Sequence, residues 1–137
     1  MNVKRLDGDL LNFWVAKSLG LKLLEQAPEP GTPHDPESGS WHPDNFHPAS
    51  NWSHAGPIVA NEWYVIEDTL LEWFGPEWPK GNMIINFPTA WFMRAYVASQ
   101  YGDEVEEVAP VKPGGALSTV NLARLKLGSL RGRREVA

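Results

Sequence analysis

Residues 88–102, PTAWFMRAYVASQYG, carry the strongest helical signal in the chain. Proline suits the first turn of a helix and glycine suits the position that ends one, so Pro88 and Gly102 bound the segment. At about 100° per residue its apolar side chains fall on one broad arc. The arc comprises Ala90, Trp91, Ala95, Val97, Ala98 and Tyr101, with Thr89, Tyr96, Ser99 and Gln100 opposite. This pattern predicts a helix over 88–101 at the centre of the core.

Arg94 interrupts that apolar arc. A guanidinium group cannot be buried unpaired without a large free-energy cost, so it must reach water or meet a carboxylate. The candidate carboxylate partners are those of Asp9, Glu62 and Asp103. A structural ion pair that orients the helix is the favoured interpretation, and recognition of an anionic ligand is the alternative.

A second helix is expected over residues 9–19, where leucines, Trp14 and Val15 recur at helical spacing. Asp7 or Asp9 can cap its start, and Gly20 can supply a left-handed end. The next stretch, LKLLEQ at 21–26, reads as a short strand. Pro57 is expected to open a short helix, PIVANE, over 57–62.

Three further stretches read as extended: WYVIED at 63–68, LLEWF at 70–74 and NMIINF at 82–87. The turn-forming GPEWPKG separates the second from the third. The sequence therefore predicts an α+β fold in which a small antiparallel sheet is packed by the two main helices.

Residues 27–50 hold six of the twelve prolines, which predicts a long surface loop. A chain of 137 residues suits one domain. We assign that domain to residues 1–109, including the proline-rich loop, and we treat 110–137 as a basic C-terminal extension. Residues 1–109 hold 16 Asp and Glu against 6 Lys and Arg, a balance of −10, whereas 110–137 hold 1 against 6, a balance of +5.

The basic extension suggests contact with nucleic acid, because its cations could neutralise several phosphates. The residues concerned are Arg124, Lys126, Arg131, Arg133 and Arg134. The extension contains no aromatic residue and follows an acidic body, so a solubilising or self-docking role is the favoured alternative.

Catalytic and metal chemistry find little support in the sequence. The absence of cysteine excludes disulfides and thiolate sites. His42, Asp44, His47 and His54 lie at irregular spacing on a proline-broken loop, which argues against a metal site. No nucleophile elbow, phosphate-binding glycine loop or HExxH helix is present. We therefore expect no cofactor, no metal and no catalytic residue, and a non-enzymatic role is favoured.

The chain lacks both a signal-type apolar segment and a run of eighteen apolar residues, so we expect a soluble intracellular protein without a membrane partner. Seven tryptophans in a chain of this size indicate a compact aromatic core or an aromatic binding face.

Three stretches together resemble the NinX-like family of small phage and prophage proteins. They are LDGDLLNFWVAKSLG at 6–20, PASNWSHAGPIV at 48–59 and PTAWFMRAYVASQYGDEV at 88–105. The positions that match the family pattern are Leu6, Gly8, Trp14, Val15, Ala16, Lys17, Pro48, Trp52, Gly56, Pro57, Ile58, Pro88, Thr89, Met93, Arg94, Tyr96, Val97, Ala98, Ser99, Gly102, Asp103, Glu104 and Val105. The histidines and the basic extension lie outside this pattern.

The resemblance implies a phage accessory protein that acts in the cytoplasm of the bacterial host, and it implies no particular reaction. Our first hypothesis is a module that binds a host or phage protein through Trp41, Phe46 and Trp52 around Arg94, because tryptophan and arginine often dominate interfaces. The alternative is nucleic-acid association through the extension. A small-molecule enzyme or anion binder centred on Arg94 ranks third.

Overall fold

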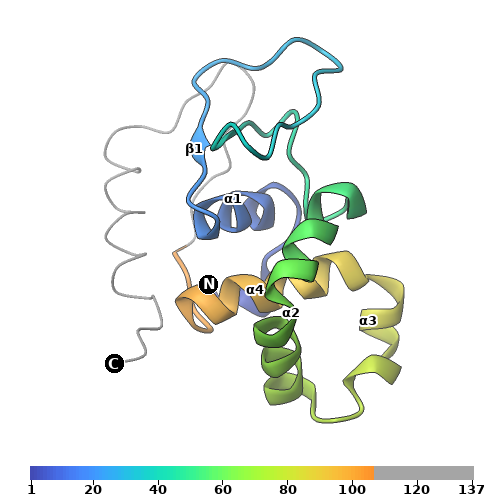
Figure 1. Cartoon of the computed structure of the whole chain (residues 1–137). Coiled ribbons are helices and arrows are strands. Elements are labelled where there is room, and N and C mark those ends of the chain that lie inside the picture. The colour runs from blue at the N-terminus through green and yellow to red at the C-terminus, as the bar shows by residue number, and fades with distance from the viewer. Residues whose placement is uncertain (107–137) are drawn as a thin grey trace.

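The computed structural model of the chain describes residues 1–106, and four α-helices dominate it (Figure 1). In order, its elements are the 3-10 helix η1 (Val3–Arg5), α1 (Gly8–Ser18), β1 (Lys22–Leu23), β2 (Ser40–Trp41), α2 (Trp52–Phe74), the 3-10 helix η2 (Trp78–Lys80), α3 (Asn82–Asn86) and α4 (Pro88–Tyr101). Helices together with one small sheet confirm the α+β class, while the nature of the sheet differs from the prediction.

Helix α4 is the centre of the molecule, as the pattern of residues 88–102 predicted. It contacts α1, α2, α3 and η1, and Figure 1 shows these elements gathered around it. Its buried residues are Trp91, Met93, Ala95, Tyr96, Val97, Ala98 and Tyr101. Tyr96 was predicted to lie opposite the apolar arc, but it is only 3% exposed, so the buried part of the helix is wider than predicted. Burial on most sides is typical of a central core helix.

Helix α1 agrees with the predicted helix over 9–19 to within one residue at each end. Gly20 follows it with a φ of 74°, the left-handed conformation expected of a stop residue. Asn12 is a buried polar residue of this helix, and its side-chain oxygen accepts a hydrogen bond of 2.7 Å from the backbone N–H of Ala49. This bond fastens the end of the proline-rich segment to α1.

Helix α2 replaces the short helix and the two strands that were predicted between residues 57 and 74. It begins at Trp52, where the Asn51 side chain caps the N–H of Ser53 at 2.9 Å, and Pro57 lies inside it. Glu62 has non-helical φ and ψ of −119° and 22°, so α2 consists of two helical segments joined at a kink. The aromatic and β-branched residues of 63–68 suggested a strand. The buried residues Ile66, Thr69 and Leu70 are instead spaced by three and four residues, which is the period of a helix with one buried face.

The sheet is parallel and very small, so the predicted antiparallel sheet is wrong. Residues 82–87 form α3 and its end, and 63–74 belong to α2. Strand β1 falls within the predicted strand at 21–26, and strand β2 lies inside the proline-rich segment. In their pairing, Lys22 is opposite Ser40 and Leu23 is opposite Trp41. The remaining pairing in residues 1–106 is an isolated antiparallel bridge between Asn2 and Glu104.

That bridge belongs to a clasp between the two ends of the described chain. The Met1 ammonium lies 3.4 Å from a carboxylate oxygen of Glu104 and donates to the carbonyl of Val105 at 2.6 Å. The N–H of Val3 donates to the carbonyl of Asp103 at 2.8 Å. These contacts join the first residues of the chain to residues 103–105. The proposed division at residue 109 and the extension over 110–137 lie outside the described residues.

Helices of this described region are all too short or too polar to cross a lipid bilayer.

Candidate functional site

The four residues predicted to form one binding site lie in three different surroundings. Trp41 and Phe46 are core residues, 3% and 2% exposed, with ring centroids 6.4 Å apart. The Trp41 ring also meets Phe13 of α1 at 6.0 Å. Both rings therefore anchor the proline-rich segment to the body and present little surface to a partner.

Arg94 ties α4 to the segment between η1 and α1. Its Nε donates to the carbonyl of Leu6 at 2.6 Å, and its guanidinium lies 4.5 Å from the centroid of the Trp91 ring. The carboxylate beside it is that of Asp7, at 3.7 Å, an acid that was not among the predicted partners. Burial lowers the pKa of Arg94, and Asp7 opposes that shift. These contacts support the structural interpretation of Arg94 over the anion-binding one.

Trp52 belongs to a cluster of rings that we call the aromatic surface, composed of Trp52, Trp63, Trp78 and Phe92. The Phe92 ring of α4 is central, with centroid distances of 6.3 Å to Trp52, 5.7 Å to Trp63 and 6.2 Å to Trp78. Trp52 and Trp63 from α2 are 53% and 38% exposed, whereas Trp78 from η2 is buried, with its ring centroid 6.0 Å from that of Trp63. The surface therefore joins a buried base to two rings in contact with solvent.

Local backbone geometry holds the Trp52 ring against the helix. A Cβ added at Gly56 would lie 3.4 Å from the Trp52 indole nitrogen, so the glycine leaves room for the indole to pack on α2. Trp63 and Trp78 meet Phe92 at interplanar angles of 89° and 85°, the edge-to-face arrangement that aromatic pairs favour, whereas Trp52 is tilted at 58°. All three tryptophan rings thus pack against Phe92 in the chain without a partner.

More apolar side chains are exposed on the neighbouring elements. Met83 and Ile85 of α3 are 52% and 59% exposed, and Phe87, which precedes α4, is 65% exposed. Helix α3 contacts η2 and α4, the elements that carry Trp78 and Phe92. Such exposure on adjoining elements is unusual for a monomeric protein and is typical of an interaction surface.

The segment that carries the three tryptophans of the aromatic surface is rich in acids. Residues 52–79, which hold α2 and the start of η2, contain no Lys or Arg, and their acids are Glu62, Glu67, Asp68, Glu72 and Glu77. Lys80, which ends this run, pairs with Glu77 at 3.1 Å. A cationic partner would therefore be attracted to α2.

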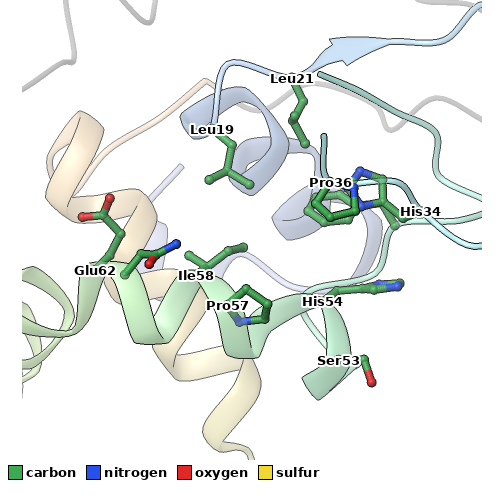
Figure 2. Close-up of a pocket in the computed structure, with 11 residues that line it drawn as sticks. Leu19, Leu21, His34, Pro36, Ser53, His54, Pro57, Ile58 and Glu62 are labelled. Atoms are coloured by element: carbon green, nitrogen blue, oxygen red, sulfur yellow. The ribbon is translucent and has the colours of Figure 1, made fainter. Parts of the chain in front are cut away.

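On another side of α2, a pocket of about 330 Å³ opens between the end of α1, the proline-rich segment and α2. Its walls are mostly apolar, and its residues are Leu19, Leu21, His34, Pro36, Phe46, Ser53, His54, Pro57, Ile58, Asn61 and Glu62. Figure 2 shows His34 and His54 at one end and Glu62 at the other, with Pro57 and Ile58 between them.

The histidines at that end have defined hydrogen-bond roles. His54 Nδ1 accepts from the backbone N–H of His47 at 2.9 Å, and His34 Nε2 lies 3.0 Å from the carbonyl oxygen of Ser40 and donates to it. Burial lowers the pKa of His54, and the nearby His34 and His47 lower it further. His42 is buried, and its Nδ1 accepts from the N–H of Asp44 at 3.0 Å. Among residues 1–106, no three His, Asp or Glu side chains are grouped so that they could hold a metal ion.

Sequence reasoning missed Trp63, Trp78 and Phe92, as well as the pocket. Trp52 and Trp63 both contact Phe92, and this arrangement can be inferred only once residues 52–74 are recognised as helical. The pocket draws on three separate segments and has no local signal. The basic residues proposed for nucleic-acid binding, from Arg124 to Arg134, lie outside the described residues, and that role stays a prediction.

Comparison with known proteins supplies one match. A family model described as “Bacteriophage P22, NinX” matches residues 2–100, which confirms the resemblance found in the sequence motifs. No curated protein and no solved structure matches the chain.

Proposed function

Because the chain belongs to the bacteriophage P22 NinX family, we propose that this phage protein is a non-enzymatic accessory module that binds a basic segment of a host or phage protein through its aromatic surface. The proposal places this binding in the cytoplasm of the bacterial host. The exposure of Trp52 and Trp63 over the Phe92 ring carries it.

Ordered aromatic rings are well suited to such binding. A free protein gains stability by burying tryptophan, yet two tryptophans here keep 53% and 38% of their surface exposed. Their positions against Phe92 are set before binding, so association orders few additional side chains. Tryptophan is also among the residues that contribute most to measured interface energies.

The partner's chemistry follows from the charge of α2. The carboxylates of Glu67 and Asp68 follow Trp63 along the helix, and residues 23–79 contain no Lys or Arg. Complementary charge speeds association and selects between partners. The segment that binds should therefore combine apolar residues with lysine or arginine.

Site-specific photocrosslinking in host cells that carry the phage tests this proposal. The photoreactive residue p-benzoylphenylalanine replaces Trp52 in one full-length variant and Trp63 in a second. A third variant places it at Leu24, which is 37% exposed but lies beyond β1, as the matched control. The expected result is one discrete adduct shared by positions 52 and 63 and absent at 24.

The crosslinked peptide gives the decisive reading. A lysine- or arginine-rich peptide whose capture weakens at high salt supports the proposal, since exposed charge interactions are screened within about 8–10 Å at ordinary ionic strength. The proposal is overturned if both aromatic positions stay uncrosslinked, if Leu24 gives the same adducts, or if the captured peptide is acidic.

A further inference from the structure

We infer that the pocket between α1, the proline-rich segment and α2 binds an organic cation carried on an apolar stem, with the Glu62 carboxylate as its counter-ion. The inference is independent of the proposed protein-binding function, because none of the residues of the aromatic surface lines this pocket.

The size and walls of the pocket suit a small apolar stem. Its volume of about 330 Å³ lies at the lower end of the range for small-molecule sites. Leu19, Leu21 and Ile58 provide aliphatic walls, and Phe46 adds an aromatic one. Figure 2 shows Leu19 and Leu21 on the side of the pocket opposite Pro57 and Ile58 of α2. A stem of several carbons would be covered from two sides.

Glu62 gives the pocket a negative charge that no lysine or arginine lining it within residues 1–106 balances. Its side chain is half-buried, and within the described part of the chain it makes no hydrogen bond or ion pair. It stands where α2 kinks, at the end of the first helical segment. A carboxylate in partly apolar surroundings gains stability from a cation. An ammonium or guanidinium group at this end of the pocket would supply that partner.

Within residues 1–106, no lysine or arginine lines the pocket, so this described part of the chain places no cation there. The titratable groups that face it are Glu62, His34 and His54, and the phenol of Tyr96 from α4 lies close enough to Glu62 to feel its charge. The pKa of Tyr96 is raised to about 12, first by burial and then by Glu62, so its phenol stays neutral.

At the end of the pocket formed by His34 and His54, a ligand is expected to present a neutral hydrogen-bond acceptor and not a second cation. Because His54 Nδ1 accepts the N–H of His47, its proton sits on Nε2 in the neutral ring. His54 and Glu62 are eight residues apart on α2, which corresponds to about 12 Å at 1.5 Å per residue. The ligand class is therefore an amine or guanidine with an apolar body, able to accept a hydrogen bond at its far end.

Two sources could supply this chemistry: a free organic amine of the host cell, or the side chain of a lysine or arginine on a polypeptide. Both present the same cation on the same kind of stem. The experiment below tests the shared chemistry first and then separates the two sources.

The test is a titration of the ¹⁵N-labelled full-length chain, followed by amide chemical shifts, with three matched probes. Hexylammonium is cationic, 1-hexanol is its neutral counterpart and hexanoate is anionic. We expect hexylammonium to shift the amides of Leu19, Leu21, Ser53, His54 and Asn61 in a saturable manner. Hexanol and hexanoate should bind at least about tenfold more weakly, the factor expected from one charge-assisted hydrogen bond.

Two isosteric substitutions assign the effect to one carboxylate. Glu62→Gln should weaken hexylammonium binding about tenfold or more, whereas Glu67→Gln makes the same change five residues along α2, outside the pocket, and should leave it unaltered. Equal binding of hexanol and hexylammonium, absence of saturable shifts, or equal effects of the two substitutions would each overturn the inference.

A pair of peptides identifies the source. One carries a single lysine among apolar residues, and the other carries norleucine, which keeps the stem and lacks the ammonium. Shifts at the same amides with the lysine peptide alone assign the ligand to a polypeptide side chain. Shifts with hexylammonium and with neither peptide assign it to a free amine. Trp52→Ser should leave all these titrations unchanged, so failure of the aromatic surface as a binding site is distinguishable from failure of this pocket.

Discussion

Replacing Arg94 with methionine is expected to lower the free energy of unfolding by about 2 kcal/mol. The substitution removes the hydrogen bond of 2.6 Å from Nε to the Leu6 carbonyl, and a hydrogen bond from a charged group contributes about 1.5–3 kcal/mol. It also removes the cation from its position 4.5 Å from the Trp91 ring, a contact worth about 0.5–1 kcal/mol. Methionine keeps the apolar stem packed, and the relief of a buried charge offsets part of the loss.

The carboxylate of Asp7 should matter far less. Its side chain is 81% exposed and lies 3.7 Å from the guanidinium, so solvent screens the pair, and Asp7→Asn should cost less than about 0.5 kcal/mol. Arg94→Lys keeps the charge without the Nε donor, and most of the loss should remain. The carbonyl of Leu6, rather than an acid, is thus the partner that fixes α4 against the start of α1.

Urea unfolding followed by tryptophan fluorescence measures these differences, with the slope of free energy against urea serving as a check on two-state behaviour. For a body of about 100 residues, 2 kcal/mol corresponds to roughly 8–16 °C in Tm. An Arg94→Met protein as stable as the wild type would refute the reasoning. So would an Asp7→Asn protein destabilised as much as Arg94→Met, since the ion pair would then dominate.

Three further results are expected. Asn12→Ala should cost about 1–3 kcal/mol in urea unfolding, because it leaves the buried N–H of Ala49 without its acceptor; a cost below about 0.5 kcal/mol would contradict this. Gly20→Ala should cost about 1–2 kcal/mol, because φ is 74° there and a Cβ disfavours that conformation; a stabilised variant would show that the residue relaxes easily. In an absorbance titration at alkaline pH, Tyr96 should ionise after the exposed Tyr64, because its pKa is raised to about 12, and Tyr96→Phe should remove the late phase. Since the folded pKa of Tyr96 lies above the unfolded value of about 10, its contribution to stability is complete below pH 10 and falls as the pH rises toward 12. Ionisation of all tyrosines in a single early phase of the titration would contradict the burial of Tyr96.

The helices with defined ends could be predicted from the sequence. Pro88 and Gly102 mark both ends of α4, and Gly20 marks the end of α1, so periodicity and end signals agree at both elements. In α2 they disagree. Pro57 suggested a helix start where the chain is already helical, and the aromatic and β-branched residues of 63–68 resembled a strand. Packing against α4 overrides that local preference, as tertiary contacts commonly do.

The sheet could not be predicted in its actual form. Strands β1 and β2 are two residues long and lie 17 residues apart in the chain, and so short a run carries too little alternation to identify a partner. Long-range pairing of this kind depends on where the loop between them packs. Here Trp41, a residue of β2, is buried in the core beside Phe13, and this packing fixes the position of β2.

The candidate site was predicted in part. Trp52 was predicted as a binding residue together with Trp41 and Phe46, and composition alone could not distinguish the exposed Trp52 from the two buried rings. Arg94 drew attention because it interrupts an apolar face, and the structure gives it contacts within the fold. Phe92 went unnoticed because it lies off the arc defined for its helix. Whether an aromatic ring is exposed or buried depends on which helix it packs against, and the sequence alone does not give that packing.

The most direct test of the aromatic surface is the affinity of the full-length chain for the basic peptide captured by crosslinking, measured by calorimetric titration for the wild type and for Trp52→Ser. Loss of an exposed ring that dominates an interface costs at least about 2 kcal/mol, so the dissociation constant should rise roughly thirtyfold, while Tm changes little. Equal dissociation constants for the two proteins would contradict the claim that this surface binds the partner.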